Sequence, residues 1–437
     1  MPAPDRLRLS GLPSAGGLHV PPPEVLRARG GKKWKTYARG VLPMWIADMD
    51  FDVAEPIRTV VAEAATAGAF AYPSEDLYAA VGGAFVHRME TRFGWAPDPA
   101  GVELLADLVQ GLVTTVMAAT DPGDAVVTLT PVYPPFLMAA QTAGRRLVPV
   151  DLRPERDYRV DPDELAAAVG RSGARLLLLC NPHNPTGRVL DADELTGVAE
   201  VARRFDLLVV SDEVHADLVL DRVEHRPFAL ISGDTRERTI TLQSASKAFN
   251  LGGLRCGVAH FGSDALRRRF EARFPPRALG RVTAPSARAT VAAWTHGDPW
   301  LAKVVDQLRA NRDALGAWIR SVAPAVTWTP PQATYLAWLG FTAWSDAEDG
   351  SAARDLLGSA RVALSPGEDF GGPQHSHRAR LNFATSPELL DRGLTRIGAA
   401  LGAITATPDG TRDPGGGQPP QRAAATSTPT RQAGGEH

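Results

Sequence analysis

Three polar side chains follow apolar runs at positions where they could act together on one small molecule. Asn184 lies in the turn NPHNPTG, Asp212 ends the run DLLVVSD, and Lys247 follows the run TITLQSAS. A carboxylate at the end of a buried run needs a cationic partner, because an unpaired buried charge is costly. A lysine among small residues can be made neutral by burial, and its amine can then form an imine with a carbonyl compound. Taken singly, the asparagine could be structural and the lysine a surface residue.

The elements that would position these side chains are indicated by six apolar runs in the middle of the chain. They read DAVVTLTP, RRLVPVDL, ARLLLLCNP, DLLVVSDEV, TITLQSAS and RCGVAHFG. Continuous rather than alternating runs are typical of strands buried on both faces. Intervening segments such as DADELTGVAEVARRF begin with an acid and end with bases, as helices do. The alternation predicts an α/β fold with a mostly parallel sheet covered by helices, and a ligand at the carboxyl ends of its strands.

A smaller second lobe is expected after the sheet. A long amphipathic stretch, residues 300–324, precedes the strand-like segments ATYLAWLGF, ARVALSPG and RARLNFATS and a final helix to about Leu401. We therefore predict an N-terminal arm joining the small domain (1–55), a large domain (56–295), a small C-terminal domain (296–404) and a tail (405–437). The tail is rich in Gly, Pro, Thr and Ala and is predicted to be disordered.

The overall composition indicates which partners to expect. The 437 residues include 47 basic and 49 acidic side chains, which leaves no surplus for holding nucleic acid or an anionic membrane. No apolar run approaches the length of a transmembrane helix or a secretory signal. Only two cysteines occur, which fits a reducing cytoplasm. We predict a cytoplasmic protein with no nucleic-acid partner, no membrane contact and no metal ligand.

Taken together, the three segments resemble the fold type I pyridoxal 5'-phosphate enzymes of the aspartate aminotransferase superfamily, over nearly the whole chain up to about residue 400. The resemblance implies a seven-stranded sheet with a smaller α+β domain. It implies that Lys247 carries the cofactor and moves protons, that Asp212 pairs with the pyridine nitrogen and that Asn184 bonds the ring's phenolic oxygen. Ser244 and Arg255 match the positions that hold the phosphate, a sound pair for a dianion.

Other residues would complete the cofactor site. Gly111, in LVQGLVTTVMAAT, is placed at a helix start, so that the amides of Gly111, Leu112 and Val113 would point at the phosphate; alternatively the glycine only begins a helix. Tyr133 matches the aromatic ring that covers the pyridine face, with a core tyrosine as the alternative. Tyr72, in FAYPSE, resembles the tyrosine that reaches a neighbouring subunit's phosphate, which implies a homodimer with shared active sites.

A substrate site is implied near the end of the chain. Arg380 in RARLNFA matches the arginine that grips the α-carboxylate of an amino-acid substrate with a two-pronged contact. Arg378, two residues earlier in the same segment, is expected to be exposed to solvent.

Local features favour the carbon–sulfur lyase branch, the cystathionine β-lyase-like enzymes. LPMWIADMDF, Leu42 to Phe51, resembles that branch's N-terminal signature. His215 stands where typical aminotransferases place a tyrosine near the ring oxygen. The expected reaction is α,β-elimination from an S-substituted L-cysteine, giving a thiol, pyruvate and ammonia.

Three other functions stay open at this point. The same residues would serve an aminotransferase, because fold does not decide reaction. A specialised biosynthetic enzyme on a cysteine conjugate is a further alternative. A regulator that keeps the fold and binds a partner protein would not need Lys247, Asp212 and Asn184, so their presence argues against it.

Overall fold

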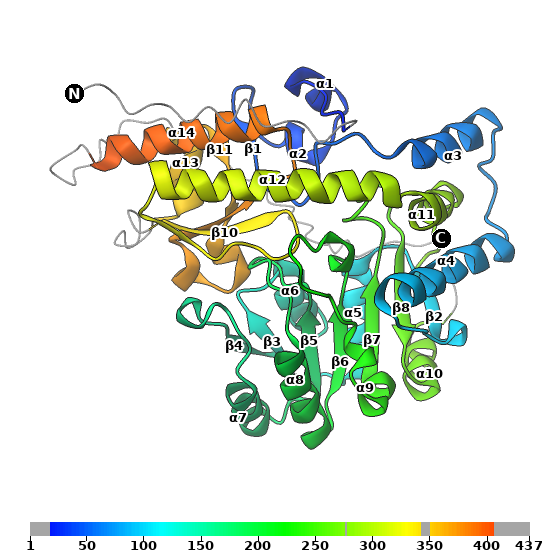
Figure 1. Ribbon diagram of the computed structural model, residues 1–437. Helices are drawn as coiled ribbons and strands as arrows, with labels where there is room; N and C mark the ends of the chain where they lie inside the picture. The colour runs from blue at the N-terminus through cyan, green and yellow to red at the C-terminus, as the bar shows by residue number, and fades with distance from the viewer. Residues whose placement is uncertain (1–17, 276–277, 342–349, 406–437) are drawn as a thin grey trace, which may run out of the picture.

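The computed structural model describes residues 18–275, 278–341 and 350–405, and the protein consists of a large and a small β-sheet with their covering helices (Figure 1). Of the tail predicted to be disordered (405–437), residues 406–437 lie outside the described part. Thr405 itself ends the last helix, which is therefore slightly longer than predicted.

The large sheet has seven strands in the order β2-β8-β7-β6-β5-β3-β4. Strands β3 to β7 are mutually parallel where they pair, whereas β8 is antiparallel to both of its neighbours. A mixed, mostly parallel sheet is thus confirmed. The strands are β2 Val102–Leu105, β3 Ala125–Thr130, β4 Arg146–Asp151, β5 Leu176–Cys180, β6 Leu208–Asp212, β7 Thr239–Gln243 and β8 Gly257–Phe261.

All six apolar runs form strands, but one expectation about them is wrong. Strand β4 is not buried on both faces, because it lies at the edge of the sheet, and all its residues except Val150 are exposed or half-buried. Strand β2 was not predicted, since it is short and mostly half-buried and contains a charged residue, Glu103.

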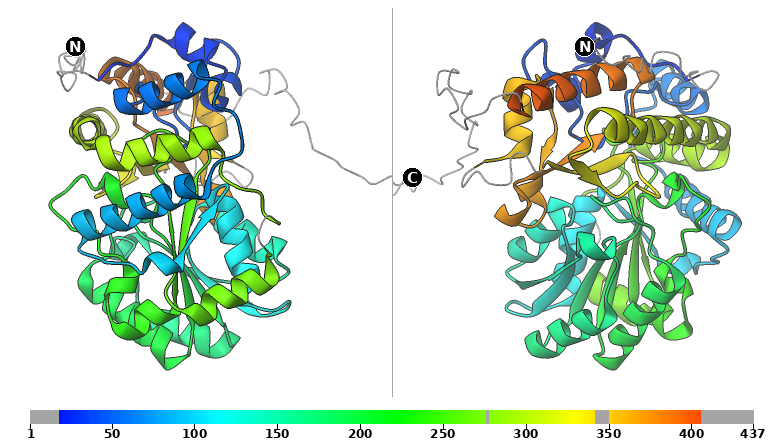
Figure 2. Two further views of the ribbon diagram at one scale, coloured as in Figure 1. Left: turned by 90° about the vertical axis from the view of Figure 1, so that its right-hand side faces the viewer. Right: turned by 60° about the vertical axis from the view of Figure 1, so that its left-hand side comes forward.

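Helices cover both faces of the large sheet, as the nearly edge-on view in Figure 2 shows. One apolar cluster packs α5, α6 and α10 against one face, and a second packs α7 and α8 against the other. Asp191 begins α8 with a capping box and Arg203 and Arg204 end it, as its sequence predicts. The helices around the large sheet are α3 Glu55–Thr66, α4 Glu75–Phe93, α5 Leu108–Ala119, α6 Pro134–Thr142, α7 Pro162–Ser172, α8 Ala192–Arg204, α9 Gly233–Arg238, α10 Asp264–Arg273 and α11 Ala284–His296.

The small sheet has the order β12-β13-β10-β9 and is antiparallel. Its strands are β9 Val326–Trp328, β10 Leu336–Phe341, β12 Ser365–Pro366 and β13 Arg378–Asn382, and the helices near it are α12 Asp298–Val322, α13 Ala352–Ser359 and α14 Pro387–Thr405. Near the N-terminus lie α1 Pro23–Ala28 and α2 Lys32–Lys35. Strand β1 Leu42–Pro43 pairs in parallel with β11 Val362–Ala363, so the segment before the large sheet lies beside the C-terminal lobe.

Candidate active site

A cavity of about 430 Å³ opens at the carboxyl ends of the central strands. Asp212 is the last residue of β6, Asn184 follows β5, and Lys247 follows β7; all three line this cavity. The structure therefore brings together the three side chains that the sequence singled out. The other predicted residues in its wall are Tyr133, His215, Ser244 and Arg255.

Lys247 is enclosed by protein except where it lines the cavity. Its Nζ donates a hydrogen bond to the carbonyl oxygen of Ala47 at 3.1 Å. Burial lowers the pKa of the Lys247 amine, and the nearby charge of Arg380 acts in the same direction, while Asp48 and Asp212 oppose them. A lowered pKa raises the share of neutral amine, the form that attacks a carbonyl carbon.

Asp212 is a buried carboxylate without a cation in contact. Its Oδ1 accepts a hydrogen bond from the amide of Val214 at 3.1 Å. Burial raises the pKa of Asp212 to about 6, because the charged form has lost its water, and Lys247 only partly offsets this. A ligand that brings a positively charged nitrogen to this carboxylate would stabilise its ionised form.

His215 lies beside the same cavity as a neutral ring. Burial, assisted by the charges of Lys247 and Arg380, lowers the pKa of His215 to about 3. Its Nδ1 is buried and has no hydrogen-bond partner among the described residues. Its ring packs edge-on against Tyr335, with centroids 6.1 Å apart.

Arg380 reaches the site from β13 and is almost completely buried. Its Nη1 donates to Oδ1 of Asn184 at 3.0 Å, and its Nη2 donates to the carbonyl oxygen of Trp45 and to Oγ of Ser365 at 3.1 and 3.2 Å. Burial lowers the pKa of Arg380 to about 10. Its Nε is a buried donor without a partner in the described structure, which suits a carboxylate.

The predicted start of α5 is wrong. The helix begins at Leu108 with Asp107 as its N-cap, and the amide of Gly111 already donates to the carbonyl oxygen of Asp107 at 3.0 Å. The predicted amides of Gly111, Leu112 and Val113 therefore belong to the helix interior. The residues that line the cavity there are 107–110. Asp107, three residues before Gln110, was the N-cap signal that the sequence offered.

The two residues predicted to hold a phosphate also line the cavity. The hydroxyl of Ser244 donates to the carbonyl oxygen of Cys256 at 2.6 Å, so its proton is used within the turn. Arg255 is exposed and forms an ion pair with Asp107 at 2.7 Å. Ser246, which the sequence analysis did not single out, also lines the cavity.

The two predicted tyrosines have different positions. Tyr133 is half-buried at the start of α6 and lines the cavity. Tyr72 lies between α3 and α4, is fully exposed, and is not among the residues that line the cavity. Within one chain, the structure does not bring Tyr72 to the other site residues.

These groups fit pyridoxal 5'-phosphate by their chemistry. Asp212 can pair with the protonated pyridine nitrogen, and Lys247 can bind the aldehyde carbon covalently. The unpaired donor on Arg380 and the unpartnered Nδ1 of His215 can receive polar atoms of an amino acid and of the cofactor. The first amides of α5, with Arg255 beside them, form an end suited to a phosphate.

Comparisons with known proteins agree with this chemistry. The family described as aminotransferase class I and II matches residues 41–397. The chain is 35% identical over 364 residues to cystathionine β-lyase PatB of Bacillus subtilis (strain 168), covering 82% of this chain and 92% of that protein.

Two solved structures are similar over most of their length. A putative PLP-dependent β-cystathionase from Corynebacterium diphtheriae matches with a TM-score of 0.81 at 30% identity, covering 88% of this chain and 99% of that one. OvoB matches with a TM-score of 0.79 at 38% identity, covering 85% and 96%. From the extent of the family match and the identity to PatB, the chain belongs to the aminotransferase class I and II family.

Proposed function

We propose that the protein is a pyridoxal-phosphate-dependent carbon–sulfur β-lyase that acts on an S-substituted L-cysteine such as cystathionine. The observation that carries the proposal is the meeting of Lys247 and Asp212 in the wall of one cavity with Asn184, which accepts a hydrogen bond from Arg380, in a chain 35% identical to a cystathionine β-lyase. The products are a thiol, pyruvate and ammonia.

The cofactor, when bound, supplies an electron sink for negative charge that develops on the substrate's Cα. Arg380 binds the α-carboxylate through its unpaired donor and so orients Cα toward Lys247. Lys247, once its amine is released, removes the proton from Cα. The thiolate then leaves from Cβ, and the enamine that is released reacts with water to give pyruvate and ammonia.

The remaining polar residues hold the cofactor in this proposal. Asp212 pairs with the ring nitrogen, and Asn184 and His215 face the ring oxygen side. Tyr133 covers one ring face, and Ser246 and Arg255 with the amides of residues 108 and 109 hold the phosphate. Ser244 joins them by exchanging its bond to the carbonyl oxygen of Cys256. The buried, neutral His215 can donate or accept a hydrogen bond without adding charge beside Lys247.

We also propose a homodimer in which Tyr72 of one subunit reaches the phosphate of the other. A tyrosine that is fully exposed in one chain, on a loop between two helices, supports this arrangement. If sites are shared, a mixture of Tyr72→Phe and Lys247→Ala subunits forms hybrid dimers with one intact site and regains activity. No regain after subunit exchange would contradict the shared site.

The remaining proposals concern the chain as a whole. We propose a large cofactor-binding domain (56–295) and a small domain (296–404) that the N-terminal arm (1–55) joins, supported by the pairing of β1 with β11.

No helix within the described ranges is long and apolar enough to cross a bilayer. Both cysteines are free and buried, which supports a cytoplasmic location.

The test is the reaction with L-cystathionine in the absence of any 2-oxo acid. The holoenzyme is expected to release pyruvate and free thiol in equal amounts over many turnovers, and the Lys247→Ala variant none. A single conversion of the cofactor to its amine form, without pyruvate, would instead identify an aminotransferase.

A further inference from the structure

The segment 45–50, here called the strap, crosses between the two sheets. Its first four carbonyl groups accept hydrogen bonds alternately from residues of the candidate site and from Asn382. The carbonyl oxygen of Trp45 accepts from Arg380, and that of Ala47 accepts from Lys247. Those of Ile46 and Asp48 both accept from Nδ2 of Asn382 at 2.7 Å. Alternate carbonyls thus face the reacting groups and the small sheet.

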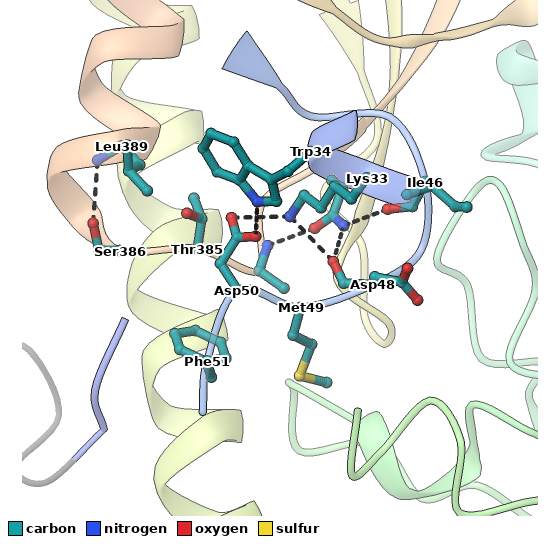
Figure 3. A network of polar contacts seen from close by, with 12 residues as sticks. Lys33, Trp34, Ile46, Asp48, Met49, Asp50, Phe51, Thr385, Ser386 and Leu389 are labelled. Atoms are coloured by element: carbon teal, nitrogen blue, oxygen red, sulfur yellow. Dashed lines mark hydrogen bonds and ion pairs between the residues drawn. The ribbon is translucent and has the colours of Figure 1, made fainter. Parts of the chain in front are cut away.

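A buried ion pair anchors the strap from behind (Figure 3). Nζ of Lys33 lies 3.0 Å from Oδ2 of Asp50, and the two side chains are only 4% and 3% exposed. The same Nζ donates to the carbonyl oxygen of Asp48 at 3.1 Å. Trp34 donates its Nε1 proton to Oδ1 of Asp50 at 2.8 Å, so both carboxylate oxygens are bonded.

The anchor also fixes the strap to the small sheet. The amide of Asp50 donates to the carbonyl oxygen of Ala384 at 2.9 Å. On the other side, the amide of Met49 donates to Oδ1 of Asn250 at 3.0 Å, three residues after Lys247. Through Met49 and Asp50, the strap is therefore bonded to the segments that follow β7 and β13.

Burying two charges is expensive, and such a pair adds little to stability compared with apolar residues of the same shape. Its best-attested use is to specify one register of neighbouring groups. Here a shift of the strap by one residue would turn the carbonyls of Trp45 and Ala47 away from Arg380 and Lys247. Neither Lys33 nor Asp50 lines the cavity, so any effect on the reaction must pass through the strap.

We propose that Lys33 and Asp50 are positioning residues for the reaction, which hold the carbonyls of Ala47 and Trp45 against the Lys247 amine and the Arg380 guanidinium. The inference rests on the proposed function for the roles of Lys247 and Arg380. The carbonyl of Ala47 also accepts from the hydroxyl of Tyr335 at 2.9 Å, which gives the amine a fixed acceptor at the cavity wall. An amine held in this way meets the aldehyde of the cofactor in one geometry.

The test uses the double variant Lys33→Met with Asp50→Asn, which removes both charges together and leaves an acceptor for Trp34. The matched control is Lys35→Met, an exposed position in the same helix. The first readout is the rate at which cofactor-free protein recaptures pyridoxal 5'-phosphate, as a function of pH. The second is the separation of KM from kcat with an S-substituted cysteine.

The double variant is expected to recapture the cofactor about tenfold more slowly and to show a KM raised about tenfold, as the loss of roughly one well-placed hydrogen bond at each group implies. The control is expected to behave as the wild type. A lowered melting temperature with unchanged recapture rate and KM would overturn the proposal, because it would show a purely structural ion pair.

A second variant keeps the test decisive if the double variant does not fold. Trp34→Phe removes one bond to Asp50 and leaves the ion pair in place, so it should shift both readouts in the same direction by a smaller factor. No shift in Trp34→Phe would contradict the proposal. Cofactor recapture does not depend on which reaction follows, so a failure of the lyase assay and a failure of the anchor are distinguishable.

Discussion

The guanidinium group of Arg380 donates a hydrogen bond to Oδ1 of Asn184 at 3.0 Å, which joins the small sheet to the cofactor edge of the large sheet. The residue expected to bind the substrate's carboxylate therefore contacts the residue expected to bind the ring oxygen. Any movement of one changes the geometry of the other, so substrate binding and cofactor orientation are coupled through a single contact.

Replacing Arg380 by lysine should impair substrate binding strongly. Lysine keeps a charge but loses the planar fork and the bonds to Asn184, Trp45 and Ser365. We expect kcat/KM for an S-substituted cysteine to fall about 100-fold or more, equivalent to roughly 3 kcal/mol, with most of the effect in KM. Steady-state kinetics measure this.

The matched control is Arg378→Lys. Arg378 lies two residues earlier in the same strand, and its guanidinium is 5.8 Å from the centre of the Tyr158 ring. Its kcat/KM should remain within about twofold of the wild type, the scale of a surface substitution. Equal losses of kcat/KM in the two variants would mean that any substitution in β13 disturbs the fold, and would contradict a specific role of Arg380 in substrate binding.

Replacing Lys247 by alanine should abolish the covalent link to the cofactor. Within the described residues, its side chain donates a single hydrogen bond, to the carbonyl oxygen of Ala47, so the fold should persist. Mass spectrometry after borohydride reduction should find the cofactor on the peptide containing residue 247 in the wild type and on no peptide in the variant. A cofactor bound to another lysine would refute the assignment.

Asp212→Asn should stabilise the cofactor-free protein at high pH. Burial raises the pKa of Asp212 from 3.8 to about 6, so between these values the native state holds a proton that the unfolded chain has released. The wild type therefore loses free energy of unfolding as pH rises through this window, up to about 3 kcal/mol, whereas the neutral variant does not.

Urea unfolding of both cofactor-free proteins at pH 4 and pH 8 measures this difference. The variant should be more stable at pH 8, and its advantage should shrink at pH 4, where the wild-type carboxyl is protonated. An advantage that is the same at both values would show that the charge of Asp212 is not the cause.

Gly111→Ala should lower stability without weakening cofactor binding. A Cβ at this position would lie 2.5 Å from Cδ1 of Leu105, so the substitution overpacks the core at a cost of about 1–3 kcal/mol. The dissociation constant for pyridoxal 5'-phosphate should change by less than about threefold, because the cavity is lined by residues 108–110 instead. A large loss of affinity at unchanged stability would restore Gly111 as a phosphate ligand.

The sequence predicted the centre of the site well, because its residues follow strands whose apolar runs are unmistakable. Asp212 and Lys247 are placed by strands that pack on both faces, and such strands leave little choice of register. The start of α5 was predicted three residues too late, because the prediction was based on Gly111 and not on Asp107, whose carboxylate caps the helix.

Other features could not be predicted because their partners lie far away in the chain. Nothing in the sequence near Lys33 indicates that its charge would be buried against Asp50, because that burial depends on packing against the small sheet. Likewise the bond from Lys247 to Ala47 joins residues 200 positions apart. Within one chain Tyr72 is fully exposed, so its proposed contact with a phosphate requires a second subunit.

The strap has a consequence for the order in which the chain is made. Its neighbours in the small sheet include Asn382 and Ala384, which leave the ribosome long after the strands of the large sheet have been synthesised. Until then the strap lacks these bonds to the small sheet and has only those to Lys33 and Asn250. The Lys247 amine is thus fully enclosed only after the small sheet has been added to the large one.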